Sequence, residues 1–200
     1  MLINPYLVGI PAPSATWNPA DKNAGITLNS GNLVAINTAG ALGYCGVRAT
    51  KGIPATSKGY FEILILTMDL GGFTVVGIGN LSQVLNSFVG SGANGWAYYA
   101  ATGEKVTGGA TSAYGAPFAT GDRIGIAFDN GKVWFAKNGT WQNSGDPAAG
   151  TGEAFSGITG DVYPMASIQD GFTNESVQAA FAYSNLVFTP PSGFPSWDVA

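Results

Sequence analysis

The segment at residues 123–141 constrains the fold most, because apolar and small residues alternate in it as in a β-strand and two turn motifs follow. Large apolar residues stand at every second position from Ile124 to Phe128, which indicates a strand with one buried face. Asp129-Asn130-Gly131 then provides a turn, and KVWFAK (132–137) runs back as the partner strand. Asn138-Gly139 makes a second turn. The pattern predicts an antiparallel hairpin in which Trp134 and Phe135 point to opposite faces, so that at least one of them belongs to the core.

The rest of the chain favours the same class of structure. No segment carries a sustained 3.6-residue apolar period with caps, so we expect very little helix. Gly accounts for 30 of 200 residues without any repeat, a density that suits many tight turns between short strands. The other predicted strands are 60–68, 73–78, 96–100, 162–168, 177–183 and 186–188.

The domain organisation is expected to be simple. Pro5, Pro11 and Pro13 predict an extended N-terminal arm over residues 1–15, and residues 16–200 are expected to form a single domain. No run of 18 apolar residues occurs, which predicts no membrane insertion, and the first residues lack the basic region of a signal peptide.

Charge narrows the choice of partners. Only 10% of the residues are charged, and 8 Lys and Arg stand against 12 Asp and Glu. No basic stretch exists to neutralise phosphates, so nucleic acid is not expected as a partner. A surface with so few charges is more often covered by neighbouring molecules, which leaves a homo-oligomer open.

The sequence offers little catalytic chemistry. It has no histidine, which removes His-based triads and His-based metal sites, and its lone Cys45 is expected to be a small buried residue. Asp122 and Asp129 lie seven residues apart on one strand, about 23 Å, too far for a glycosidase dyad. We therefore predict no enzyme activity, no catalytic residues, no metal and no cofactor. Asp122 and Asp129 are expected to brace turns, and Glu62 to be hydrogen-bonded within the fold, with Arg48 or Arg123 as its partner.

The hairpin and its flanks resemble the SPRY domain family. YGAPFATGDRIGIAFDNGKVWFAKNGTW (114–141) is similar to the central signature of that family, and the similarity extends over about residues 16–197. The matching flanks, in order, are 17–35, 59–65, 75–80, 95–105, 153–168 and 181–197. The resemblance implies an all-β fold, a two-sheet antiparallel β-sandwich of the concanavalin-like jelly-roll type. It also implies recognition of a protein or peptide by loops at one end, without catalysis.

The insert WQNSGDPAAGTG (141–152) and the solitary domain resemble the bacteriophage and prophage versions of this family. The leading hypothesis is therefore a virion protein, such as a capsid decoration, head fibre or tail-associated adhesin. It would contact other capsid or tail proteins, or a host surface protein, and would be made in the host cytoplasm. The alternative is a carbohydrate-binding module for host surface glycans. A glycoside hydrolase that uses Glu62 or Glu153 is a remote third.

Six residues are candidates for a binding site because they occupy positions typical of the family. Each is a rigid aromatic side chain or a forked cation, the types that anchor interfaces. They are Tyr44, Arg48, Trp96, Tyr98, Trp141 and Phe172.

Overall fold

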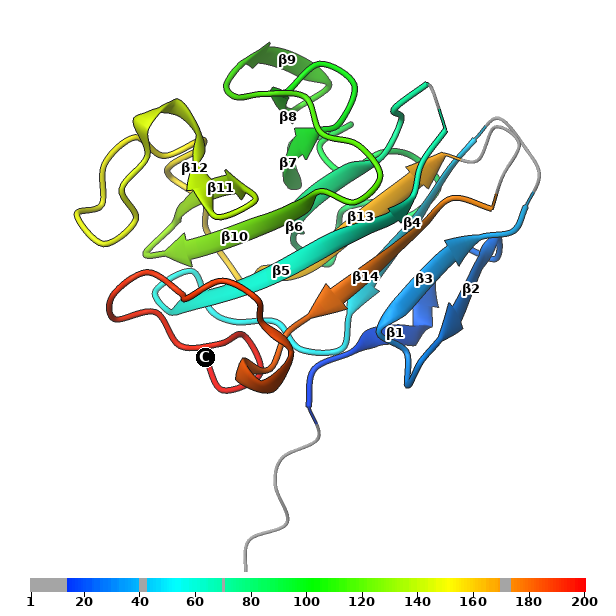
Figure 1. Ribbon diagram of the computed structural model, residues 1–200, viewed down its shortest axis with the longest axis horizontal. Coiled ribbons are helices and arrows are strands. Elements are labelled where there is room, and N and C mark those ends of the chain that lie inside the picture. Colours follow the sequence, from blue (N-terminus) through cyan, green and yellow to red (C-terminus); the bar gives the residue numbers. More distant parts are fainter. Residues whose placement is uncertain (1–13, 40–42, 70, 170–173) are drawn as a thin grey trace, which may run out of the picture.

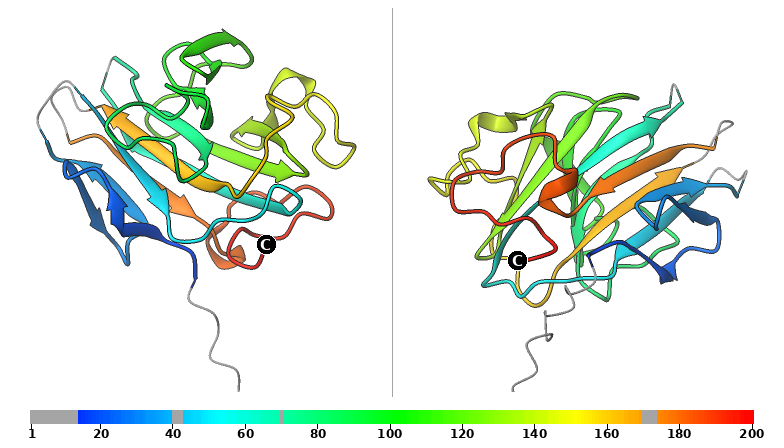
Figure 2. Two further views of the ribbon diagram at one scale, coloured as in Figure 1. Left: turned by 180° about the vertical axis from the view of Figure 1, so that it is seen from behind. Right: turned by 60° about the horizontal axis from the view of Figure 1, so that its bottom comes forward.

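The computed structural model describes residues 14–39, 43–69, 71–169 and 174–200. Two seven-stranded antiparallel sheets pack face to face, and the only helical turns in these ranges are the 3-10 segments Gln142–Ser144 and Tyr183–Asn185. One sheet lies in front of the other in Figure 1, and the views from behind and from below in Figure 2 show the second layer. The predicted all-β sandwich with little helix is confirmed.

We call the first layer sheet A; its strands follow the spatial order β1-β4-β13-β6-β7-β8-β9. Its strands in chain order are β1 (Trp17–Lys22), β4 (Tyr44–Ala49), β6 (Val75–Gly79), β7 (Gly95–Tyr99), β8 (Glu104–Thr107), β9 (Ala110–Ala113) and β13 (Tyr163–Gln169).

We call the second layer sheet B; its spatial order is β12-β11-β10-β5-β14-β3-β2. Its strands in chain order are β2 (Ile26–Asn29), β3 (Val34–Asn37), β5 (Lys58–Thr67), β10 (Arg123–Asp129), β11 (Lys132–Lys137), β12 (Thr140–Trp141) and β14 (Ser176–Ala180).

The hairpin that the sequence predicts is β10–β11, with Ile124 opposite Lys137 and Asp129 opposite Lys132. Its turn residues Asn130 and Gly131 both have positive φ, 46° and 75°, the left-handed backbone that Asn and Gly tolerate best. Phe135 points into the space between the sheets, and Trp134 points out of the sandwich. The expectation of opposite faces is confirmed.

The core between the sheets is rich in aromatic rings. Tyr98 stacks on Phe135 with 5.5 Å between ring centroids, and Trp17 meets Phe181 edge-on at 5.3 Å. Cys45 is 6% exposed and faces this core, as expected of a small buried residue. Such burial of large rings supplies the main free energy that holds the sheets together.

The C-terminal part of the chain, residues 183–200, crosses the outer face of sheet B; we call it the closing segment. Leu186 and Phe194 pack with Trp134 and Tyr60 in a small apolar cluster there. The expected strand at 186–188 is wrong. The backbone N–H groups of Val187 and Phe188 donate to the Glu62 carboxylate, at 2.9 and 2.8 Å, instead of to a neighbouring strand.

Glu62 is fully buried and is the anchor of this closing segment. Its carboxylate also accepts from the Tyr60 hydroxyl at 3.0 Å and pairs with the Arg123 guanidinium at 3.3 Å. Four donors therefore compensate the buried charge, which confirms Arg123 as the partner. Burial also raises the pKa of the Tyr60 hydroxyl, and the adjacent Glu62 charge adds to that rise.

The two turn aspartates of the hairpin differ in their partners. Asp122 accepts from the backbone N–H of Ala119 at 2.8 Å, as expected of a turn brace. Burial opposes its ionisation, but this bond and those from Asn138 and Lys137 hold its pKa below the usual range. Asp129 instead pairs with the Lys58 ammonium at 3.0 Å, a side chain on the neighbouring strand β5.

Candidate functional site

The outer face of sheet A carries a second apolar cluster, separate from the main core. Strand alternation sends Val76 and Ile78 inward and leaves Val75 on the outer side. Val89, Ala97, Val106 and Met165 complete the cluster. An apolar sheet face on the outside of a sandwich needs a cover, and residues 80–94, which we call the cover loop, provide part of it.

The cover loop is pinned to sheet A by buried polar side chains. The Arg48 guanidinium donates to the carbonyl oxygen of Gln83 at 2.6 Å and forms an ion pair with Asp21. The Ser167 hydroxyl accepts from the N–H of Val89 at 3.1 Å. These bonds satisfy loop backbone groups that burial would otherwise leave unpaired, so the loop has a defined position.

Gly46 allows the cover loop to lie directly on strand β4. Its N–H donates to the carbonyl oxygen of Leu85 at 2.8 Å. A Cβ atom on Gly46 would stand 3.1 Å from that same oxygen, closer than most real contacts. A larger residue there would therefore push the loop away from the sheet.

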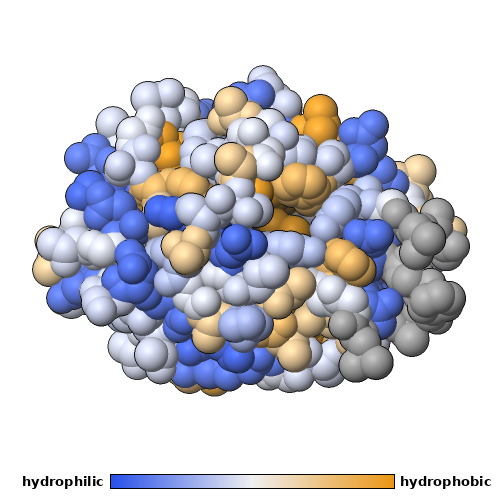
Figure 3. All heavy atoms as spheres, turned by 90° about the horizontal axis from the view of Figure 1, so that it is seen from above, coloured by the Kyte–Doolittle hydropathy of each residue, from blue (hydrophilic) through white to orange (hydrophobic). Residues whose placement is uncertain are grey.

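Between the cover loop and the strand ends lies an open apolar hollow, which we call the aromatic pocket. It measures about 170 Å³, and its lining contains no charged side chain. The face seen in Figure 3, which carries the β8–β9 hairpin, shows apolar residues recessed among polar ones. The lining residues are Tyr44, Val75, Phe88, Tyr99, Val106 and Thr111.

Ring contacts shape the walls of the aromatic pocket. Tyr44 and Phe88 meet edge-on, with 5.3 Å between their ring centroids. Burial raises the pKa of the Tyr44 hydroxyl, and the neighbouring Tyr99 hydroxyl raises it further. Tyr44 is neutral at physiological pH, as an ordinary phenol is, and its surroundings disfavour the charged form further, so the pocket suits an uncharged group.

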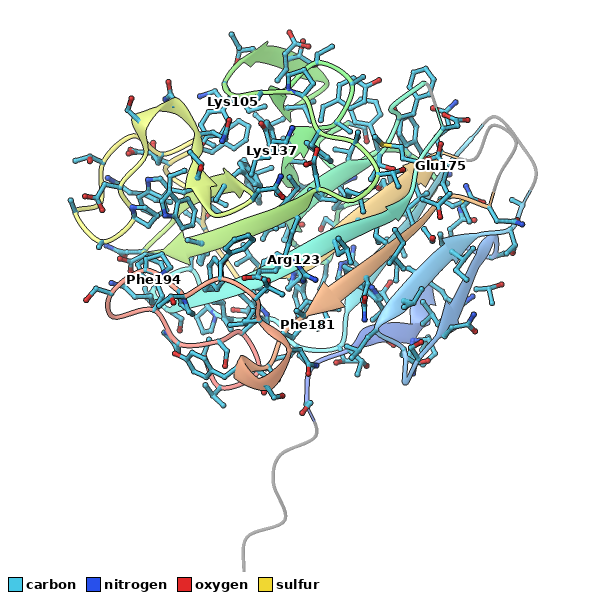
Figure 4. The ribbon with its side chains drawn as sticks, in the orientation of Figure 1. Lys105, Arg123, Lys137, Glu175, Phe181 and Phe194 are labelled. Carbon is cyan, nitrogen blue, oxygen red and sulfur yellow. The ribbon has the colours of Figure 1, made fainter. Side chains whose placement is uncertain are left out.

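A buried carboxyl group, Glu175, lies at the same end of the sandwich (Figure 4). Its oxygens accept from the N–H of Asp69 at 3.0 Å and from the Thr74 hydroxyl at 3.3 Å. It is 0% exposed, and no ion pair with a Lys or Arg of the described chain involves it. Burial raises its pKa to about 7, and the adjacent Asp69 carboxyl contributes to the rise.

The structure brings two of the six sequence-predicted residues to this site. Tyr44 lines the aromatic pocket, and Arg48, 3% exposed, holds the cover loop and so acts as a positioning residue. Trp96 and Tyr98 face the core between the sheets instead, and Tyr98 is fully buried. The ring of Trp141 packs edge-on against Tyr60 on sheet B, at 6.2 Å.

Phe172 lies outside the described residues. A binding role for any of the six stays a prediction.

Sequence reasoning identified only Tyr44 of the six pocket residues and missed five. Val75 lies on a strand that was expected, but it was not a candidate site residue. Phe88 sits in an irregular loop, LSQVLNSFVG (81–90), whose pattern predicts no strand, and Val106 and Thr111 belong to a hairpin that was not expected. One signal was available, since Gly108-Gly109 between two short polar runs is a hairpin turn, and both glycines have positive φ. Tyr99 was passed over beside Tyr98, although alternation puts the two rings on opposite faces.

The described residues contain no cluster of three or more His, Cys, Asp or Glu side chains that could hold a metal ion. No helix in the described ranges has the length and apolar character needed to cross a bilayer.

Comparison with known proteins places these features in context. The family profile for the SPRY domain matches residues 58–183, more than half of the chain. Ran-binding protein 9 from Xenopus laevis is 28% identical over 193 residues, which cover 92% of this chain and 33% of that protein. Ran-binding protein 10 from Danio rerio is 27% identical and is covered to 30%. The chain thus spans about a third of the length of these relatives.

Solved structures agree on the fold. The SPRY domain of human HERC1 superposes with a TM-score of 0.66 at 19% identity, covering 82% of this chain and 96% of that one. Stonustoxin superposes with a TM-score of 0.60 at 18% identity, covering 84% of this chain and 27% of that one.

Proposed function

The chain belongs to the SPRY domain family, and we propose that it is a non-catalytic protein-binding module that docks a partner at the aromatic pocket. The observation that carries the proposal is the pocket itself. It is an apolar hollow of about 170 Å³ on a sheet face that the cover loop covers in part. The Arg48 guanidinium donates to the loop, and the Ser167 hydroxyl accepts from it, so the loop is held in place. A preformed apolar hollow with rigid aromatic walls is the usual anchor point of a protein interface.

The similarity to Ran-binding proteins 9 and 10 supports a binding role, since those proteins are named for a protein that they bind. The relatives are about three times longer than this chain, so their names do not identify the partner that this chain binds. Among the groups that could occupy the pocket, an uncharged aliphatic or small aromatic side chain fits best, because no lining residue is charged.

A peptide library displayed on phage and selected against the intact protein tests this proposal. We expect enriched peptides to share one large apolar residue, and we expect Phe88→Ala, which removes one wall of the pocket, to weaken their binding at least about tenfold. The matched control is Val187→Ala, an exposed apolar residue on the closing segment over the opposite sheet. Peptides that bind both variants equally would place the docking site elsewhere.

The virion role expected from the sequence finds no support among the relatives named above, which are animal proteins. Mass spectrometry of purified phage particles remains its test, and absence from mature particles would rule it out together with the expected virion location.

The carbohydrate-binding alternative needs exposed aromatic rings that sugars can stack on. In the described ranges the aromatic residues more than a third exposed are Phe73 and Tyr183, which border strands of different sheets and form no common platform.

A further inference from the structure

The N-terminal arm has a composition that calls for an apolar partner. Residues 1–13, MLINPYLVGIPAP, lie outside the described residues and contain seven large apolar side chains and no charged one. A segment of this kind in water exposes apolar surface that it gains free energy by burying.

The aromatic pocket matches that arm in chemistry and size. It has uncharged walls and a volume of about 170 Å³, and an apolar cavity of roughly 150 Å³ is enough to hold benzene. One side chain of the size of Leu, Val or Ile fits such a space.

The β8–β9 hairpin adds a place for the backbone of an incoming segment. Gly108-Gly109 form a two-residue turn, so Thr107 and Ala110 are the first pair that exchange hydrogen bonds. Alternation then directs the N–H and C=O groups of Thr111 and Ala113 to the outer edge of sheet A. Strand β9 is an exposed edge strand, and Thr111 also lines the pocket. An extended segment along this edge can pair its backbone and place a side chain in the pocket.

The direction of the chain favours a pocket on a second molecule. Strand β1 runs antiparallel to β4, with Trp17 beside Ala49, whereas the pocket lies at the Tyr44 end of β4, about 17 Å away along the strand. The described chain thus begins, at Ser14, near the Trp17 end of β1 and far from the pocket, and the prolines at 11 and 13 favour extended backbone in the residues before them. Thirteen residues reach at most about 45 Å, enough to span to a neighbouring copy.

We propose that the arm of one copy docks in the aromatic pocket of a second copy, along strand β9, so that the protein self-associates by exchanging arms. This inference rests on the proposed function in one respect, because the pocket must be a protein-docking site. It names the occupant as a second copy of this chain.

The test uses two full-length variants with complementary defects. Leu7→Asp with Ile10→Asp puts charges on the arm and leaves the pocket intact. Thr111→Trp fills the pocket from an exposed position that tolerates an aromatic residue and leaves the arm intact. The matched control is Ser112→Trp, which adds the same ring one residue further along β9, on the opposite face. Circular dichroism establishes that all variants are folded.

Sedimentation velocity from about 1 µM to about 1 mM measures the association. We expect the parent protein and Ser112→Trp to self-associate with rising concentration. Each defective variant alone should stay monomeric, or associate at least about tenfold more weakly. A mixture of the two should form a heterodimer, because one supplies the arm and the other the pocket.

Three results would overturn the inference: a parent protein that is monomeric throughout, arm charges that leave association unchanged, or a mixture whose components stay separate. A protein whose arm bound the pocket of its own molecule would be monomeric and would give the first of these results. A different result would overturn the proposed function. If library peptides still bind at the pocket while arm exchange is absent, the pocket remains a docking site for another partner.

Discussion

Glu62 and Glu175 are both fully buried carboxyl groups, but the protein treats them in opposite ways. Glu62 lies on sheet B beside the Arg123 guanidinium and also receives two backbone N–H groups and a hydroxyl. Glu175 lies at the end of the sandwich beside another carboxyl group, Asp69, and has no ion pair with any Lys or Arg of the described chain. Figure 4 shows Arg123 in the middle of sheet B and Glu175 near the strand ends.

The difference in partners shows that Glu62, not Glu175, is the carboxyl group whose buried charge the fold compensates. A buried charge is tolerated when donors surround it, and Glu62 uses its donors to tie the closing segment to strand β5. Among the described residues Glu175 has two hydrogen-bond donors and no cationic partner, so desolvation by burial dominates and raises its pKa to about 7. Glu62 anchors the closing segment through its donors, whereas Glu175 has a pKa near neutrality.

Removal of the anchor should have the largest effect. Glu62→Ala leaves the Arg123 guanidinium and the N–H groups of Val187 and Phe188 without their acceptor. We expect a loss of about 3–5 kcal/mol in the free energy of unfolding, measured by urea titration. Glu62→Gln, which keeps one acceptor oxygen, should lose less. A loss below about 1 kcal/mol for the alanine variant would show that the closing segment is held by its apolar contacts alone.

The next largest effect should come from Glu175 and should depend on pH. Its pKa rises from 4.5 to about 7 on folding, so the folded state holds the proton more tightly, and this group costs stability as pH rises through that window. Glu175→Gln keeps a neutral side chain at every pH. Relative to the parent, the variant should gain up to about 3 kcal/mol between about pH 4.5 and about pH 8.

Urea titrations of both proteins at several pH values measure this difference. A difference between the two proteins that stays constant across the window would show that Glu175 remains charged in the folded state.

Arg123→Met would leave Glu62, like Glu175, without a cationic partner among the described residues. It removes the cation but leaves the backbone donors to Glu62 in place. Because the Arg123 side chain is partly exposed, we expect a loss of about 2 kcal/mol at neutral pH. A loss below about 1 kcal/mol, no larger than that of an exposed ion pair, would contradict this account.

The smallest effect should come from an ion pair at the surface. Lys132 and Glu153 are 3.3 Å apart, and both side chains are partly exposed. Lys132→Met should cost less than about 1 kcal/mol by the same titration, since water screens the pair. A loss as large as that of Arg123→Met would mean that burial does not set the strength of these pairs.

The sequence predicted those parts of the fold that depend on residues close together in the chain. The alternation of Ile124, Ile126 and Phe128 and the two Asn-Gly turns specify the β10–β11 hairpin without reference to the rest of the chain. The turn role of Asp122 follows from the same local pattern.

Features that depend on distant segments were less accessible to sequence reasoning. The partner of Glu62 was left between Arg48 and Arg123, because the choice depends on the order of strands in the sheet. The segment 186–188 has the composition of a strand, but its N–H groups find a carboxylate that is 125 residues away for Val187. The aromatic pocket combines Tyr44, Phe88 and Thr111 from three separate parts of the chain, so only Tyr44 was anticipated.

The places of β13 and β14 have a consequence for how the protein is made. Strand β14 inserts between β5 and β3, and β13 inserts between β4 and β6, so both sheets remain split until residues 163–180 arrive. On the ribosome, the earlier strands expose unpaired edges while the chain is still being synthesised. Completion therefore depends on pairing between distant segments, which makes folding slow and leaves an unfinished chain prone to aggregate. A chain that stops before β14 lacks the strand that joins the two halves of sheet B, and a chaperone would find its binding surface along those open edges.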